Sequence, residues 1–276
     1  MNPAHKTRIV TGLIIAVVLL IALFTGGWLF FLLVLAVSVL AQWEFYTMFR
    51  PGKSAVEYKI LSLFCGAALV TGTFLGVTGN AAHLMIAAFL LIALLFLFRF
   101  GRGKETTFAD PALALAGILY LPFILQFALN LTPAHILLIL LASAGTDTGG
   151  YYAGAKYGKH HVWPSVSPKK TWEGSLGGIL LCMVLVAAYG KIILGGSVWG
   201  WLALGVLLNI ASQMGDFFES ALKRSAGVKD SSNLLPGHGG ILDRIDSILF
   251  ALPTYVLFQS VLVPETVSLA SSTPLL

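Results

Sequence analysis

The sequence has little charge and almost no cysteine. Asp, Glu, Lys and Arg make up only 11% of its 276 residues, whereas a globular domain carries about 25%. This deficit, with 57% hydrophobic residues and a mean hydropathy of +0.88, argues against a soluble fold, a disordered chain, collagen and a coiled coil. The two cysteines, Cys65 and Cys182, both lie in apolar runs, which excludes a disulfide framework and a cysteine zinc site. The remaining class is an all-α integral membrane protein that crosses the bilayer several times.

Long uncharged runs define the organisation of the chain. These runs are residues 9–41, 60–98, 111–146, 174–215 (interrupted by Lys191) and 247–264. One crossing needs about 20 residues, so each of the first four runs is about twice too long for a single helix. Turn residues interrupt these four runs near their middles, at 25–27, 78–80, 130–133 and 195–197. The sequence therefore predicts four helical hairpins and one single span, which makes about nine transmembrane helices. About five of them fall in residues 1–133, and a catalytic region occupies 134–276.

The basic residues test this division. If every long run is a hairpin, all segments between runs lie on one side of the membrane. Those segments hold 16 of the 17 Lys and Arg residues, and Lys191 is the exception. The positive-inside rule assigns the rich side to the cytoplasm, so the N-terminus is predicted to be cytoplasmic and the C-terminus outside.

Two cytoplasmic segments, 147–173 and 216–246, are longer than the others. In the second, an apolar helical pattern continues without a turn signal into a charged stretch. Asp216, Glu219, Ser220 and Lys223 then stand at i, i+3, i+4 and i+7, on one face of a helix. Ionisable residues at the margin of a span usually face the bundle interior and mark a functional site. The alternative is an exposed stripe at a helix end.

A glycine-rich stretch follows between Leu235 and Asp246. Its Pro-Gly and Gly-Gly pairs can present backbone N–H groups to an anion. Asp243 and Asp246 stand at i, i+3 in the opening turn of the last span, and with Asp216 they could form a carboxylate cage. Oxygen ligands without thiolates favour Mg²⁺ over zinc. Acids at i, i+3 are also common near helix N-termini, and His238 suits a turn-stabilising role as well as a catalytic one.

The first long segment contains Ser167-Pro168, a pattern typical of a helix start, followed by Lys169 and Lys170. Two lysines in a first turn oppose the helix dipole, which favours anions there. A substrate phosphate would resolve this conflict; alternatively, the lysines reach lipid headgroups. These residues together predict an enzyme at the cytoplasmic face that binds Mg²⁺ and a polyphosphate, with a lipid as second substrate.

Three motifs resemble those of one enzyme family. Residues 220–246, with the pattern Ser-Ala-Leu-Lys-Arg, Lys-Asp and Pro-Gly-His-Gly-Gly-Ile-Leu-Asp-Arg-Ile-Asp, closely resemble the signature of the phosphatidate cytidylyltransferases. Ser-Pro-Lys-Lys-Thr-Trp-Glu-Gly at 167–174 and Asp-Thr-Gly-Gly-Tyr at 147–151 are also similar to family motifs. The resemblance is specific over residues 143–250. It implies that CTP and phosphatidate give CDP-diacylglycerol and pyrophosphate, in a homodimeric protein of the inner (plasma) membrane whose site faces the cytoplasm.

The resemblance also implies roles for individual residues and for a cofactor. Mg²⁺ is expected, with a second cation as an option, and the partners are CTP, phosphatidate and membrane lipids but no nucleic acid. The expected catalytic residues, with the three aspartates as metal ligands, are Asp216, Asp243, Asp246, Lys223, Arg224 and His238. The expected substrate-binding residues are Ser167, Lys169, Lys170, Thr171, Lys229, Asp230, Gly239, Gly240 and Arg244. Supporting roles are expected for Asp147, Glu173, Glu219 and Ser220.

Two other functions fit parts of the pattern. A CTP-dependent polyprenol kinase would share some of these motifs and would release CDP and a phosphorylated alcohol. A non-enzymatic transporter would suit the number of spans, but it needs ionisable groups near the bilayer midplane or broken helices on both sides. The clustering of charge on one side argues against the transporter.

Overall fold

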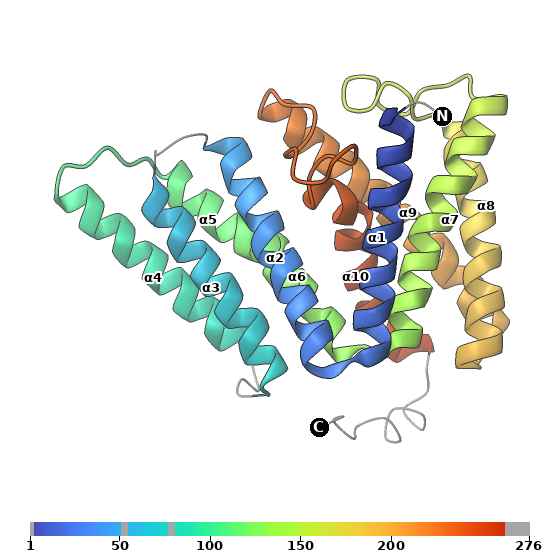
Figure 1. Cartoon of the computed structure of the whole chain (residues 1–276), viewed down its shortest axis with the longest axis horizontal. Coiled ribbons are helices and arrows are strands. Elements are labelled where there is room, and N and C mark those ends of the chain that lie inside the picture. Colours follow the sequence, from blue (N-terminus) through green and yellow to red (C-terminus); the bar gives the residue numbers. More distant parts are fainter. Residues whose placement is uncertain (1–2, 51–54, 77–80, 263–276) are drawn as a thin grey trace. The chain divides into compact units, whose positions relative to one another are not determined.

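The computed structural model describes residues 3–50, 55–76 and 81–262 of the chain. All regular elements among these residues are helices, and this described part contains no β-strand (Figure 1). The elements are α1 (Pro3–Thr25), α2 (Gly27–Phe49), α3 (Val56–Phe74), α4 (Ala81–Gly101), α5 (Ala109–Tyr120), α6 (Pro122–Leu125), η1 (Gln126–Asn130), α7 (Pro133–Tyr157), α8 (Trp172–Tyr189), η2 (Gly190–Leu194), α9 (Val198–Ser225) and α10 (Leu242–Leu262).

Six helical segments in the described residues are long and apolar enough to cross a membrane. They are Thr7–Thr25, Gly27–Phe49, Ala81–Gly101, Ala109–Asn130, Trp172–Leu194 and Val198–Ser225. Many of their large apolar side chains are exposed, as in a protein whose surface contacts lipid rather than water. The predicted all-α, multi-span membrane fold is therefore confirmed.

The helices end where the sequence has small or polar residues. α1 ends at Thr25, and Gly26 and Gly27 have φ of 67° and 50°, a region that glycine enters without steric cost. η1 ends at Asn130, and α7 begins with Pro133, which suits the first position of a helix. The expected break at 78–80 involves residues outside those that the structure describes.

The described helices fall into two compact units. The first unit comprises residues 1–130 and 230–244. Its buried core joins α2, α3, α4 and α5 through Tyr46, Tyr58, Leu69, Ile92 and Ile118. The glycine-rich segment that precedes α10 therefore belongs to the same unit as the N-terminal helices, although residues 131–229 lie between them in the sequence.

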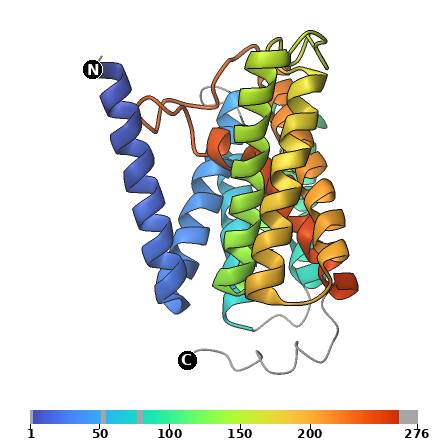
Figure 2. The ribbon, with the colours of Figure 1, turned by 90° about the vertical axis from the view of Figure 1, so that its right-hand side faces the viewer.

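The second unit comprises residues 131–229 and 245–276, and α7 and α8 form its closest helix pair. Figure 2 shows these two helices side by side. A Cβ atom on Gly149 would lie 2.5 Å from the carbonyl oxygen of Gly177, and one on Gly174 would lie 2.8 Å from that of Gly150. Small residues at these positions let the two backbones approach closely, as in other membrane helix pairs. This contact fixes α8 and the segment before it against α7.

The helix predicted to begin at Ser167-Pro168 begins later, at Trp172, and that prediction is wrong. Thr171 is the N-cap: its backbone is extended, and its hydroxyl accepts a hydrogen bond from the N–H of Gly174 at 3.2 Å. Ser167 instead closes a turn with the N–H of Lys170 (3.4 Å). The segment is held outside the helix because residues 160–162 pair with 170–172, through bonds such as Trp172 N–H to the His160 carbonyl (2.8 Å). Lys169 and Lys170 thus precede the helix and do not oppose its dipole from within the first turn.

Candidate active site

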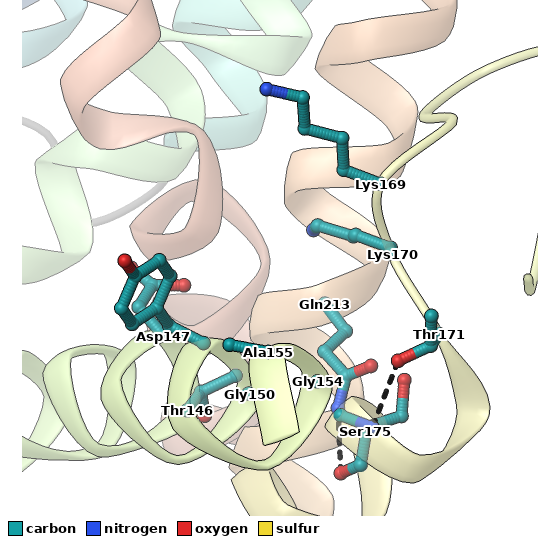
Figure 3. Close-up of a pocket in the computed structure, with 12 residues that line it drawn as sticks. Thr146, Asp147, Gly150, Gly154, Ala155, Lys169, Lys170, Thr171, Ser175 and Gln213 are labelled. Atoms are coloured by element: carbon teal, nitrogen blue, oxygen red, sulfur yellow. Dashed lines mark hydrogen bonds between the residues drawn. The ribbon is translucent and has the colours of Figure 1, made fainter. Parts of the chain in front are cut away.

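A pocket of about 490 Å³ lies in the second unit (Figure 3). α7, the start of α8, the loop between them and α9 form its walls. Its lining residues are Thr146, Asp147, Gly150, Tyr151, Gly154, Ala155, Lys169, Lys170, Thr171, Gly174, Ser175 and Gln213. Four of the residues predicted from the sequence to bind or support substrate line this pocket, namely Asp147, Lys169, Lys170 and Thr171. Gly150, Tyr151 and Gly174, from the motifs at 147–151 and 167–174, line it as well.

The two lysines enter the pocket from the loop before α8, and Figure 3 shows their side chains extending in the same direction. The Lys170 ammonium lies 2.5 Å from Oδ2 of Asp216 and 4.5 Å from the ring centre of Phe217. Both members of the ion pair keep about a quarter of their side chains exposed, at 28% and 27%. An arriving phosphate can therefore reach Lys170 without unfolding its surroundings, and Lys169 is more exposed still.

The four residues predicted to share one face of a helix all lie on α9, and they pair with one another along it. They are Asp216, Glu219, Ser220 and Lys223. The Ser220 hydroxyl donates to Oδ1 of Asp216 (3.3 Å), and Lys223 forms an ion pair with Glu219. Glu219 is fully buried, and the Lys223 side chain is only 12% exposed. The alternative of a solvent-exposed stripe is therefore wrong for this pair.

Asp246 joins the acidic groups of the second unit. Gly215 of α9 packs on the backbone of Asp246 and Ser247, where a Cβ would clash with the Asp246 carbonyl oxygen. Asp246 lies in the first turns of α10, before the uncharged run 247–264. Partial burial and the negative charge of Asp216 raise the pKa of the Asp246 carboxyl group to about 7, with a further contribution from Asp147. A cation placed between such carboxylates would relieve their repulsion.

The carboxylates of the second unit suit a magnesium ion that takes some of its ligands from the substrate. Within each unit, the described residues include no group of three or more His, Cys, Asp or Glu side chains arranged to hold a metal ion. Mg²⁺ commonly uses one or two carboxylates together with water and substrate phosphates. The two neighbouring carboxylates of Asp216 and Asp246, close to a lysine-lined pocket, fit that mode.

The glycine-rich segment of the first unit forms a tight turn. The N–H of Leu235 donates to the Gly239 carbonyl (2.8 Å), and the N–H of His238 donates to the Leu235 carbonyl (2.9 Å). Gly237 and Gly239 have φ of 76° and 79°, so both positions require glycine. The His238 ring packs beside Gly12 of α1, with Nε2 3.5 Å from the position of a Cβ there. This contact gives His238 a packing role in the turn.

Asp243 holds this segment from the start of α10. Its Oδ2 accepts hydrogen bonds from the N–H of Ser231 (3.0 Å), the Ser231 hydroxyl (2.9 Å) and the N–H of Gly240 (2.8 Å). Asp243 thus orders the loop, whatever else it binds.

Sequence reasoning missed Glu44, which contacts the same segment from α2. Its carboxylate accepts from the N–H groups of Ile241 (3.0 Å) and Leu242 (2.8 Å). The available signal was an acidic residue three positions beyond the uncharged run 9–41, inside an apolar helix.

A buried polar chain behind the pocket was also missed. The Asn209 amide donates to the Thr146 hydroxyl (3.0 Å), and the Gln213 amide donates to the Asn209 side-chain oxygen (2.5 Å). Asn209 and Gln213 stand one helical turn apart in the apolar run 174–215, and that spacing was the signal.

The other predicted residues lie as follows. Glu173 accepts from the His160 ring (2.6 Å) and from the N–H of Lys159 (3.1 Å), so it pins the loop before α8. The Arg224 guanidinium donates to the Val228 carbonyl (3.2 Å) at the end of α9. The exposed members of the predicted set include Arg224, Lys229, Asp230 and Arg244.

Comparisons with known proteins place nearly the whole chain in one family. A sequence model of the Cytidylyltransferase family matches residues 6–262. The phosphatidate cytidylyltransferase of Bacillus subtilis (strain 168) is 32% identical over 255 residues, which cover 90% of this chain and 95% of that protein. The protein of the same name from Haemophilus influenzae (strain ATCC 51907) is 31% identical over 283 residues, or 92% of this chain and 98% of the relative. A shorter match, 48% identical over 121 residues, covers 43% of this chain and 46% of the phosphatidate cytidylyltransferase of Staphylococcus epidermidis (strain ATCC 12228).

Proposed function

This chain belongs to the cytidylyltransferase family, and from that premise we propose which of its residues carry out the reaction. The protein is a nucleotidyltransferase that converts CTP and phosphatidate into CDP-diacylglycerol and pyrophosphate. The single observation that carries the residue assignment is the pocket of the second unit, where Lys169 and Lys170 face α9 and Lys170 pairs with Asp216. A pocket lined by two lysines, one of them in a partly exposed ion pair that a phosphate can replace, suits a polyphosphate substrate.

The chemistry requires positioning more than proton transfer. A phosphate oxygen of phosphatidate attacks the α-phosphorus of CTP, and the bond from that phosphorus to the bridging oxygen of the β-phosphate breaks. Pyrophosphate leaves with the electron pair. The attacking phosphate is already ionised at neutral pH, so catalysis consists of alignment and neutralisation of charge. We assign the neutralisation to Lys169 and Lys170, with Lys223 and Arg224 further along α9 and Lys229 as additional cations of the second unit. Arg244 stays a sequence-based prediction for the same role.

The Mg²⁺ site is part of the proposal. Asp216 and Asp246 would hold the ion, which when bound neutralises charge on the reacting phosphates. Asp243 stays a sequence-based prediction for the same role, alongside its observed part in holding residues 231–240. Asp147 would support the two carboxylates from the pocket wall.

The finer topology is also proposed. We place nine spans in the inner membrane, with the N-terminus and the active site on the cytoplasmic side and the C-terminus outside, in a homodimer. The support is the distribution of 16 of 17 basic residues, together with the six helices that are long and apolar enough to cross.

The family membership also decides between the functions that the sequence left open. Full-length relatives named phosphatidate cytidylyltransferase favour nucleotidyl transfer over a CTP-dependent kinase or a transporter.

One assay tests the function directly. Purified protein in detergent is incubated with phosphatidate, Mg²⁺ and CTP labelled either in the cytosine ring or in the γ-phosphate. The proposed reaction moves the ring label into the lipid phase and the γ label into pyrophosphate. A γ label found in lipid would identify a kinase instead, and removal of Mg²⁺ by a chelator should stop the reaction.

A further inference from the structure

We propose that Glu44 of α2 is a positioning residue for the glycine-rich segment 235–242 and for Asp243. Glu44 is 3% exposed, and all of the contacts that support the proposal lie within the first unit. The inference rests on the proposed function in one respect, namely that segment 235–243 takes part in the reaction.

Four donors lie within hydrogen-bond distance of the Glu44 carboxylate: two backbone N–H groups of the segment and the hydroxyls of two serines just before it, one of them shared with Asp243. Oε1 accepts from the Ser232 hydroxyl (2.6 Å) and the N–H of Ile241 (3.0 Å), and Oε2 accepts from the N–H of Leu242 (2.8 Å) and the Ser231 hydroxyl (3.2 Å). The two backbone groups belong to the start of α10, where N–H groups have no partner within the helix. A negative charge is favourable at that end, and four neutral donors stabilise it.

Ser231 links Glu44 to Asp243. Its hydroxyl lies 3.2 Å from Oε2 of Glu44 and 2.9 Å from Oδ2 of Asp243. A hydroxyl has a single proton, so it can donate to only one of the two carboxylates at a time. Any change in the position or charge of Glu44 therefore alters the hydrogen bonding of Asp243.

The contact between Glu44 and the segment leaves no room for a side chain at position 240, which is Gly240. A Cβ at this position would lie 2.5 and 2.7 Å from the two Glu44 oxygens and would overlap the Ser231 hydroxyl. The N–H of the same glycine donates to Asp243. Gly240 thus sits between the two carboxylates, and the Gly-Gly pair, expected from the sequence to bind substrate, has a second role here.

These contacts form one device. Glu44 holds the segment from α2, Asp243 holds it from α10, and Ser231 and Gly240 join the two. Because Oδ2 of Asp243 is held by three donors, the orientation of its carboxylate depends on the place of the segment, and that place depends on Glu44. Glu44 acts on the reaction through these groups and does not contact the substrate.

The first experiment measures amide hydrogen exchange in the full-length protein in detergent without substrate. Glu44→Gln replaces one acceptor oxygen by a donor that faces donors, so exchange at Gly240, Ile241 and Leu242 should be at least tenfold faster. The matched control is Asp110→Asn, which alters another buried carboxylate of the same unit that bonds to Arg50 and Thr107 instead. Unchanged exchange in the Glu44→Gln variant would overturn the proposal, and this readout does not require activity.

The second experiment measures kcat per folded molecule. Glu44→Gln should lower kcat by 10- to 100-fold, whereas a merely structural residue would lower the folded fraction and the Tm but leave kcat unchanged. Asp110→Asn should show that structural behaviour. If Glu44→Gln does not yield folded protein, Glu44→Asp, which keeps the charge on a shorter side chain, serves for both measurements and should lower kcat less.

A double-mutant cycle tests the link through Ser231. Ser231→Ala should also lower kcat, and the double variant with Glu44→Gln should lose less than the product of the two single losses, because both changes break one chain. Ser232→Ala removes a donor to Glu44 that does not reach Asp243, so its effect should stay within threefold. Independent, multiplicative losses would contradict the proposed coupling. A wild-type protein that makes no CDP-diacylglycerol would instead contradict the proposed function.

Discussion

Glu44 and Asp243 of the first unit are used differently from Asp216 of the second unit. In the first unit, Glu44 and Asp243 accept hydrogen bonds mainly from backbone N–H groups and serine hydroxyls of one segment. In the second unit, Asp216 is paired with the partly exposed ammonium of Lys170 and with the hydroxyl of Ser220. Backbone donors cannot leave without local unfolding, whereas a partly exposed ammonium can exchange a carboxylate for a phosphate.

Glu44 and Asp243 therefore fix the position of a backbone segment, whereas the Asp216–Lys170 pair can exchange partners when a substrate binds. A partly exposed ion pair is worth little in folding free energy, so breaking it to bind substrate has a small cost. A buried carboxylate with several donors costs much more to disturb. We therefore expect substitutions of Lys170 and Asp216 to affect catalysis with little loss of stability, and substitutions around Asp243 to affect both.

The largest effect is expected for the aspartates. Asp216→Asn should lower kcat by roughly 10²- to 10⁴-fold, because an amide is a poor Mg²⁺ ligand and does not neutralise its charge. The Tm should change little, since Lys170 and Ser220 are accessible to water. Asp243→Asn should show a similar loss of kcat and, in addition, faster amide exchange at Ser231 and Gly240. Kinetics at saturating Mg²⁺ and exchange measurements test the pair; a variant that keeps a tenth of the activity would not have lost a metal ligand.

The next effect concerns the two lysines of the pocket. Lys170→Gln should reduce kcat/KM by the value of one charge-assisted contact, roughly 1.5–3 kcal/mol or about 10- to 150-fold. Lys169→Gln should fall in the same range if both lysines bind a substrate phosphate. Contact with lipid headgroups alone predicts a small effect that depends on salt and on bulk lipid charge. Kinetics in neutral and in anionic mixed micelles distinguish the two, and near-normal kcat/KM in neutral micelles would contradict phosphate binding.

Much of the fold follows from composition, but the details of the site do not. The length of the apolar runs predicts a multi-span helical protein, because bilayer thickness sets how many residues one crossing needs. The spacing of Asp216, Glu219, Ser220 and Lys223 likewise predicts their shared helix. Such local periodicities can be recognised in one sequence.

Contacts between distant residues could not be predicted in this way. Nothing local in the sequence indicates that Glu44 bonds to Ile241 and Leu242, almost 200 residues away. The start of α8 was also misplaced, because Ser167-Pro168 and Thr171 are both acceptable N-caps by residue type. The choice between them is made by pairing of residues 160–162 with 170–172, which is a tertiary contact.

A smaller effect is expected at the contact between α7 and α8. Gly149→Ala places a methyl group 2.5 Å from the Gly177 carbonyl oxygen, in a position where backbone has to move. Overpacking of this kind typically costs about 1–3 kcal/mol of unfolding free energy. The matched control is Gly150→Ala on the same helix, whose Cβ would lie 3.7 Å from the Gly174 carbonyl oxygen, an ordinary contact. Thermal unfolding in one detergent should rank Gly149→Ala well below Gly150→Ala; equal Tm values would contradict the close packing of the two helices.

The smallest effect tests where α8 begins. Thr171→Ala removes the side-chain oxygen that accepts from the N–H of Gly174, and loss of an N-cap typically costs about 1 kcal/mol. Ser167→Ala should be close to neutral, because Ser167 closes its turn with the backbone carbonyl and not with the hydroxyl. Unfolding free energies of the two variants, measured in the same detergent, decide between the two starts. A larger loss for Ser167→Ala would restore the earlier start, and with it the opposition between the helix dipole and the lysines that a bound phosphate would relieve.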